Sequence, residues 1–330
     1  MPDLDAARTA SKQKDVGAPT QPVVVRSDTS QIEKRFAELE RALAVKTADR
    51  QKAYKTARAF IGSFSARRSK GTRRLAASLC DALDHVSDDE STSGALRLAL
   101  QLDDALQSGS PDELLAALTD VADLSDEASP DTRGLVLALS SQALAMLHQH
   151  FPSAIPDDGV LERAFALAEE ALALAPETAE PHAALAALIM AHGDLQALRD
   201  AEALVRRSLK LEPEHDPSAV VLANIFIARS RYDEAITLLA DLHARGNTWP
   251  FVQLLTVRCY RFTGALDQAE LALTRAIKAG IKLPAIYLEA CIVARLRHDD
   301  EAARSYRERA AELLGVEVDV DQALGYLSSP

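Results

Sequence analysis

The sequence holds little of what disulfide-rich, metal-binding or β-sheet proteins need. Only 13 of its 330 residues are glycine, 5% are aromatic, and there are three cysteines, Cys80, Cys259 and Cys291, without a CxxC pair. An odd number of unpaired cysteines is typical of reduced thiols in the cytoplasm. Along the repeated part of the chain, Val- and Ile-rich runs that alternate with polar residues and would predict a sheet are also missing. We therefore expect neither a disulfide scaffold nor a sheet.

Membrane and export signals are equally scarce. No run of 18 apolar residues occurs, so no transmembrane helix is expected. The first residues, Met1-Pro-Asp-Leu-Asp, have neither the basic region nor the apolar core of a secretory leader. The net charge of −12 argues against nucleic-acid binding by the whole molecule. We expect a cytoplasmic protein without membrane insertion.

The sequence also lacks motifs that carry chemistry. It contains no GxGxxG, GxxxxGK[ST], GxSxG or HExxH pattern. His148 and His150 come nearest to a metal pair, but residues two apart point to different faces of a helix. The acids at 299–301 begin an expected helix, where negative charge suits the helix dipole. We therefore expect no enzyme, no cofactor and no metal site.

What the sequence does have is a repeat. Five alanines recur at spacings of 37, 34, 34 and 33: Ala164, Ala201, Ala235, Ala269 and Ala302. Around them, a turn residue typically stands five positions before, and an amphipathic helix follows. Such a period predicts helix pairs that stack into an array rather than a closed globule. Alanine allows two helix backbones to approach within about 8–10 Å, so we expect all five to be buried at helix crossings.

Several segments fit one known repeat. The second helix of a unit starts at Ala164-Phe-Ala-Leu167 and Ala235-Ile-Thr-Leu-Leu239, and units close with Glu169–Pro176 and Ser208–Pro213. Leu185-Ala186 and Leu222-Ala223 supply the Leu–small pair of the first helix. Over residues 131–315 the chain thus resembles the tetratricopeptide repeat (TPR), a 34-residue helix–turn–helix unit. It departs from the family at His182, Ala219 and Gln253, where Trp is frequent, at Val257, and at an apparent insertion over 196–198.

The resemblance implies an all-α, right-handed α-solenoid whose first helices line a concave groove that binds a peptide or protein segment. Counting back from the alanines assigns partner-binding residues to that groove: Asn224, Leu254, Arg258, Arg261, Phe262, Tyr287 and Arg295. Arginines beside aromatic rings suit an acidic segment. The alternative is that these arginines pair with acids on neighbouring helices. We expect that reversing Arg258 and Arg295 to Glu weakens partner binding without lowering stability much.

The rest of the chain divides by composition. Residues 1–30 are polar and are expected to form a disordered tail. Residues 31–130 are expected to form a helical N-terminal region, and 316–330 a C-terminal cap. Helices are expected from about residue 30, around 54–64 and 75–86, and near 95–107, 111–123 and 132–150, with an acidic turn over 87–94.

A basic segment spans residues 46–74. It has ten basic residues against Asp49 alone, a local charge of +9 that leaves −21 for the rest of the chain. This segment either packs against the acidic remainder, binds another acidic protein, or contacts nucleic acid or anionic lipid. If it binds nucleic acid, reversing Arg67, Arg68, Arg73 and Arg74 to Glu is expected to abolish binding and leave the array folded.

We therefore interpret the chain as a non-catalytic scaffold or adaptor that binds a protein segment in the concave groove. The alternative is a regulatory protein whose basic N-terminal helices bind nucleic acid or an anionic surface while the array recruits a partner. A third reading, a regulatory piece of secretion or signalling machinery, also stays open.

Overall fold

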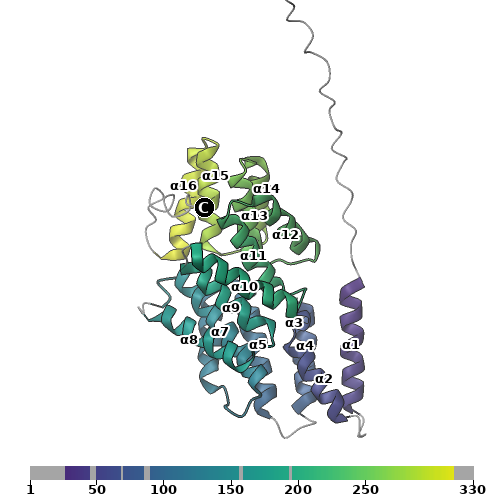
Figure 1. The fold of residues 1–330 in the computed structure, drawn as a ribbon. Helices are drawn as coiled ribbons and strands as arrows, with labels where there is room; N and C mark the ends of the chain where they lie inside the picture. The colour runs from purple at the N-terminus through teal and green to yellow at the C-terminus, as the bar shows by residue number, and fades with distance from the viewer. Residues whose placement is uncertain are drawn as a thin grey trace, which may run out of the picture.

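The computed structural model describes residues 27–44, 50–67, 70–84, 90–155, 159–192 and 195–315, and every regular element in these ranges is a helix (Figure 1). Nearly all of the expected tail and the whole expected cap at 316–330 lie outside the described residues. Among the described helices, none has both the length and the apolar character that crossing a bilayer requires.

Helix pairs form the array. The first helices of the units are α7 (Pro130–His150), α9 (Ala179–His192), α11 (Asp216–Ala228), α13 (Pro250–Phe262) and α15 (Pro284–Leu296). The second helices are α8 (Val160–Leu174), α10 (Leu195–Leu211), α12 (Tyr232–Ala244), α14 (Leu266–Lys278) and α16 (Asp300–Leu314). Each first helix packs on its own second helix and on the next first helix. The expected all-α solenoid is confirmed.

Local chemistry starts and ends these helices. Pro130, Pro250 and Pro284 occupy first-turn positions, where a missing N–H costs nothing. Between paired helices the chain turns through a left-handed residue, at Ser230 (φ 57°), Gly264 (φ 74°) and His298 (φ 61°). These three turn residues are spaced by 34, so the turns obey the repeat as strictly as the helices do.

The same spacing corrects which alanine lies at the helix crossing of the last unit. Ala164, Ala201, Ala235 and Ala269 are fully buried, as expected, but Ala302 is only half-buried and Ala303 is 5% exposed. Ala303 follows Ala269 by the same interval that separates the turn residues, and it stands five positions after His298. The prediction for Ala302 was therefore off by one position, and Ala303 is the crossing residue.

The N-terminal helices pack against the side of the array. They are α1 (Ser27–Ala44), α2 (Arg50–Gly62), α3 (Phe64–Arg67) and α4 (Lys70–Asp84), followed by α5 (Glu90–Ser108), α6 (Pro111–Asp120) and a short 3-10 turn, η1 (Val121–Asp123). Phe36, Leu43, Ile61 and Leu79 form a separate small core here. In Figure 1, α2, α3 and α4 lie between α1 and the α5–α7 helices. The expected acidic turn over 87–94 is wrong in part, because α5 begins at Glu90.

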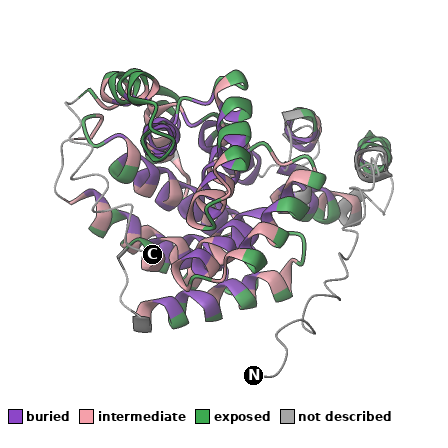
Figure 2. Cartoon of the chain, turned by 90° about the horizontal axis from the view of Figure 1, so that it is seen from above, coloured by how far each residue is buried: buried purple, intermediate pink, exposed green. Residues whose placement is uncertain are grey.

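The array also curls until its two ends touch. Gly109, before α6, lies close to Pro250 of α13: a Cβ atom added to it would be 3.6 Å from Pro250 Cγ. The ring centroids of His150 and Phe251 lie 5.3 Å apart. Ser153 Oγ donates a hydrogen bond to Leu314 O at the end of α16. One apolar core accordingly joins α5–α7 to α13–α15. Figure 2 shows buried residues on the inner sides of the helices and exposed residues on the outside. These contacts close the concave side of the solenoid.

Candidate functional site

The closed concave side contains a small cavity, which we call the concave pocket. It has a volume of about 190 Å³ and lies among helices α7, α9, α11 and α13. Its walls are mostly apolar, from Met146 of α7, Met190 of α9, Val220 of α11, and Phe251 and Leu254 of α13. Asn224, Leu254 and Arg258, three of the residues expected to bind a partner, line it.

Two residues that line this pocket each have a buried polar atom without a partner in the described part of the chain. Within the described residues, His150 Nε2 and Trp249 Nε1 are buried and make no hydrogen bond. Burial lowers the pKa of His150 to about 4, and the nearby positive charge of Arg258 acts in the same direction. The imidazole is therefore neutral at pH 7. Unpaired buried polar groups cost free energy.

Arg258 and Arg261 share one acid. Arg258 Nε donates to Glu289 Oε1 at 2.8 Å and Arg261 Nε to Glu289 Oε2 at 2.7 Å. Glu289, on α15, is fully buried, while the side chain of Arg258 is 23% exposed. This arrangement matches the alternative in which the arginines pair with acids of neighbouring helices. One carboxylate between two guanidinium groups leaves a net charge of +1 at the edge of the pocket.

The other expected groove residues lie apart from the pocket. Phe262 stacks on Tyr232 with ring centroids 5.4 Å apart, and Arg261 lies over Phe262 at 4.2 Å. Tyr287 is buried, with its hydroxyl donating to Ile281 O at 3.4 Å. Arg295 is exposed.

The use of Ala302 in place of Ala303 as the reference alanine explains why Tyr287 was wrongly assigned to the groove. Counting back from Ala302 selected Tyr287, whereas counting from Ala303 selects Leu288, which stands one full repeat period after Leu254. Arg295 still follows Arg261 by one full repeat period, so its register within the repeat is correct.

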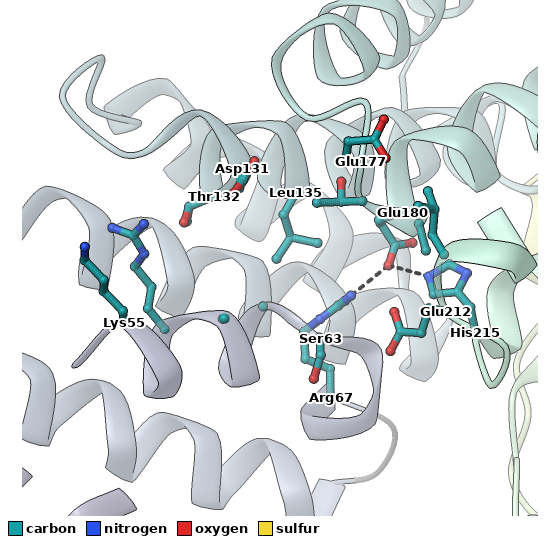
Figure 3. A pocket seen from close by; sticks show the side chains of 16 residues that line it. Lys55, Ser63, Arg67, Asp131, Thr132, Leu135, Glu177, Glu180, Glu212 and His215 are labelled. Atoms are coloured by element: carbon teal, nitrogen blue, oxygen red, sulfur yellow. Dashed lines mark hydrogen bonds and ion pairs between the residues drawn. The ribbon is translucent and has the colours of Figure 1, made fainter. Parts of the chain in front are cut away.

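A second site was missed by sequence reasoning. We call it the buried ionic cluster: Arg67, Asp103, Glu180 and His215, of which each side chain is at most 3% exposed. Arg67 Nη2 donates to Glu180 Oε2 at 2.7 Å, and His215 Nε2 lies 3.1 Å from the same oxygen. Figure 3 shows Arg67 and His215 converging on Glu180 from two sides. The cluster thereby joins α3 to the array.

Local structure places each member of the cluster. Glu180 lies in the first turn of α9 and His215 is the N-cap of α11, where its ring accepts from Ser218 N. Arg67 ends α3, and its carbonyl accepts from Arg73 Nη1 at 2.7 Å. Arg73 also pairs with Asp104. Within the described part of the basic segment, the buried arginines Arg67 and Arg73 therefore pair with acids of α5 and α9. This supports the interpretation that the segment packs against the acidic remainder.

Burial and charge shift the acids of the cluster in opposite directions. Burial raises the pKa of Asp103 to about 6, although Arg67 opposes this shift. Burial alone also raises the pKa of Glu180, but His215 and Arg67 together lower it below its ordinary value. Glu180 thus carries the negative charge that holds α3, while Asp103 is the weaker partner of Arg67.

The buried ionic cluster borders a polar cavity of about 370 Å³, between α2 and the starts of α7, α9 and α11. Lys55, Thr132 and Glu177 lie around its mouth (Figure 3). Basic side chains, Lys55 and Arg58, and acidic ones, Asp131 and Glu212, both line it, so it offers neither a clear anion site nor a clear cation site. Among the described residues no group of three His, Cys, Asp or Glu side chains is placed to hold a metal ion.

The cysteines are placed as core residues. Cys80, Cys259 and Cys291 are buried, and none of the three takes part in a disulfide. Burial raises the pKa of Cys259 to about 12 and also raises that of Cys291. Thiols in this state are poor nucleophiles at neutral pH.

Comparisons with known proteins bear on the fold. No family model matches the chain, and no curated protein does. The structure of the APC/C hetero-tetramer Cut9–Hcn1 aligns with a TM-score of 0.51 and 14% identity over 92% of this chain and 65% of that one, so this chain spans just under two thirds of its length. A tetratricopeptide repeat protein from Parabacteroides merdae ATCC 43184 aligns with a TM-score of 0.47 and 17% identity, over 84% and 99% of the two chains. With helix pairs that recur at one regular period, the fold is a TPR-like α-solenoid.

Proposed function

We propose that the protein is a non-catalytic interaction scaffold that takes an apolar anchor of a partner protein segment into the concave pocket. The observation that carries the proposal is the composition of the pocket. Apolar side chains from α7, α9, α11 and α13 converge there around a few polar groups, which is the usual chemistry of a binding site.

The size of the pocket sets the mode of binding. Its volume of about 190 Å³ is below the roughly 300–1,000 Å³ of pockets that enclose a drug-sized ligand. Contacts between the two ends of the array also block an extended segment from running along the whole concave side. The pocket therefore suits one or two inserted side chains, with the rest of the partner lying outside.

The charge at the pocket favours an acidic partner. Arg258 and Arg261 together outnumber the single carboxylate of Glu289. Arg258 binds Glu289 through Nε, so its terminal nitrogens can donate charge-assisted hydrogen bonds to a partner's acid. Asn224, on the neighbouring first helix, adds an amide that both donates and accepts.

Nothing that lines the pocket supports covalent catalysis. Its described walls include no Ser, Thr, Cys, Lys, Asp or Glu side chain. His150 therefore has no nucleophile beside it within the pocket. This composition supports a binding role.

Filling the pocket tests the proposal. Ala187 of α9 lines it and is only half-buried, so Ala187→Phe places a ring in the cavity and leaves the buried crossing residue Ala186 intact. Ala279→Phe, at an exposed position after α14, is the matched control. A partner captured with the wild-type chain should bind Ala187→Phe at least tenfold more weakly, about 1.4 kcal/mol. Equal affinity for wild type and both variants, with unchanged circular dichroism, would move the interaction away from the pocket.

A further inference from the structure

The concave pocket lies close to the point where the described chain ends. Leu314, the last residue of α16, accepts a hydrogen bond at its carbonyl from Ser153 Oγ at 2.9 Å. Ser153 follows His150, which lines the pocket, by three positions. Three residues span at most about 11 Å. The described chain therefore ends within short reach of the pocket.

The chemistry of residues 316–330 complements that of the pocket. The stretch Val316-Glu-Val-Asp-Val-Asp321 alternates aliphatic and acidic residues, and Leu324 and Leu327 follow. The whole segment contains three acids and no Lys or Arg. The pocket also has apolar walls, made of aliphatic and aromatic side chains, but its charged residue is the positive Arg258.

We propose that the acidic, apolar segment 316–330 of this same chain is the occupant of the concave pocket. Its aliphatic side chains enter the cavity and its carboxylates approach Arg258. Fifteen residues reach at most about 50 Å when extended, far more than this short distance requires.

Occupation from within the chain makes the segment a competitor of any partner. A tethered segment acts at an effective concentration in the millimolar range, so even a weak contact keeps the pocket filled. A partner must then displace the segment. The partner's apparent affinity falls by about the ratio of the segment's effective concentration to the segment's own dissociation constant. This inference uses the pocket of the proposed function but does not depend on a partner existing.

The test uses a synthetic, fluorescein-labelled peptide of residues 316–330 and two proteins, the full chain and a chain ending at Gly315, which keeps every described residue. Fluorescence anisotropy should show the peptide binding to the shorter chain, and roughly tenfold or more weakly to the full chain, whose pocket is already occupied. A peptide with Val318→Asp and Val320→Asp should not bind. Ala187→Phe in the shorter chain should abolish binding.

A second measurement keeps the test independent of truncation. In the full chain, Val318→Asp with Val320→Asp should change the emission of Trp249, the only tryptophan, and should restore binding of the labelled wild-type peptide. Equal peptide affinity for both chains, or no binding to the shorter one, would overturn the proposal. A peptide signal that Ala187→Phe leaves unchanged would place the segment elsewhere. If a captured partner binds through the pocket with equal affinity to both chains, the proposed function stands and this inference falls.

Discussion

Gln142 links the two sites described above to each other, through Glu180. Gln142 lines the concave pocket, and its Nε2 donates a hydrogen bond to Glu180 Oε1 at 2.8 Å. The other oxygen of Glu180 accepts from Arg67 of α3. A single carboxylate therefore connects the pocket to the contact that holds the basic segment on the array.

Glu180 should be one of the most sensitive positions in the chain. Glu180→Gln removes the charge that Arg67 faces in a fully buried setting. Breaking a buried ion pair from one side costs about 3–5 kcal/mol of unfolding free energy. The neighbouring Glu177, whose side chain is 75% exposed and pairs with Arg207, provides the control. Glu177→Gln should cost about 0–1 kcal/mol. Urea denaturation of both variants measures the difference, and equal losses would mean that the cluster is not what holds α3.

The raised pKa of Asp103 predicts a pH effect of defined sign. Its pKa is about 6 in the folded chain against an ordinary value of 3.8. The folded state therefore binds more protons between these values, so stability from this group is present below pH 4 and is lost as pH rises through 6. Wild type should lose stability relative to Asp103→Asn between pH 4 and pH 7, since shared contributions cancel in the comparison. A flat difference in unfolding free energy over that range would contradict the assignment.

Charge reversal at Arg258 should damage the fold. The sequence predicted that Arg258→Glu would leave stability nearly unchanged, but Glu289 is fully buried beside it. The substitution places a second carboxylate beside Glu289 and leaves Arg261 as the one cation against both, so we expect a loss of up to about 3–5 kcal/mol. Arg295→Glu, at an exposed position one repeat after Arg261, should cost far less. Thermal unfolding of the two single variants separates these outcomes, and equal midpoints would contradict the role of Glu289.

The crossing alanines can be tested in one helix. Ala235 is fully buried in α12, whereas Ala240 of the same helix is exposed. Ala235→Leu should overpack the crossing and destabilise by about 1–3 kcal/mol, while Ala240→Leu should stay within about 0.5 kcal/mol of wild type. Similar effects at both positions would mean that the repeat register is wrong.

Much of the fold could be predicted because equivalent positions of successive repeats pack in the same way and therefore carry the same kind of residue. Ala164, Ala201, Ala235 and Ala269 are buried for the reason their spacing implied, and the turn residues Gly264 and His298 follow the same period. The register slipped only at Ala302, where two adjacent alanines made the spacing ambiguous. The left-handed turn at His298, one repeat period after the turn at Gly264, settles it in favour of Ala303.

The sites were less predictable because they depend on contacts distant in sequence. Arg67 meets Glu180 across 113 residues, and the array closes through Ser153 and Leu314, 161 residues apart. No local pattern specifies such contacts. Glu289 is the residue from which the sequence could have indicated such a contact. An acid in the middle of a mostly apolar helix predicts a buried basic partner, and here the partners are Arg258 and Arg261.

The most direct test of binding at the concave pocket is a methyl spectrum of the three methionines. Met146 and Met190 both line the pocket, and Met1 lies outside the described residues and serves as a reference. With ¹³C-methyl labelling, addition of a captured partner should shift the Met146 and Met190 signals, and Ala187→Phe should prevent that shift. A partner that binds tightly while both signals stay in place would contradict the claim that the concave pocket is the binding site.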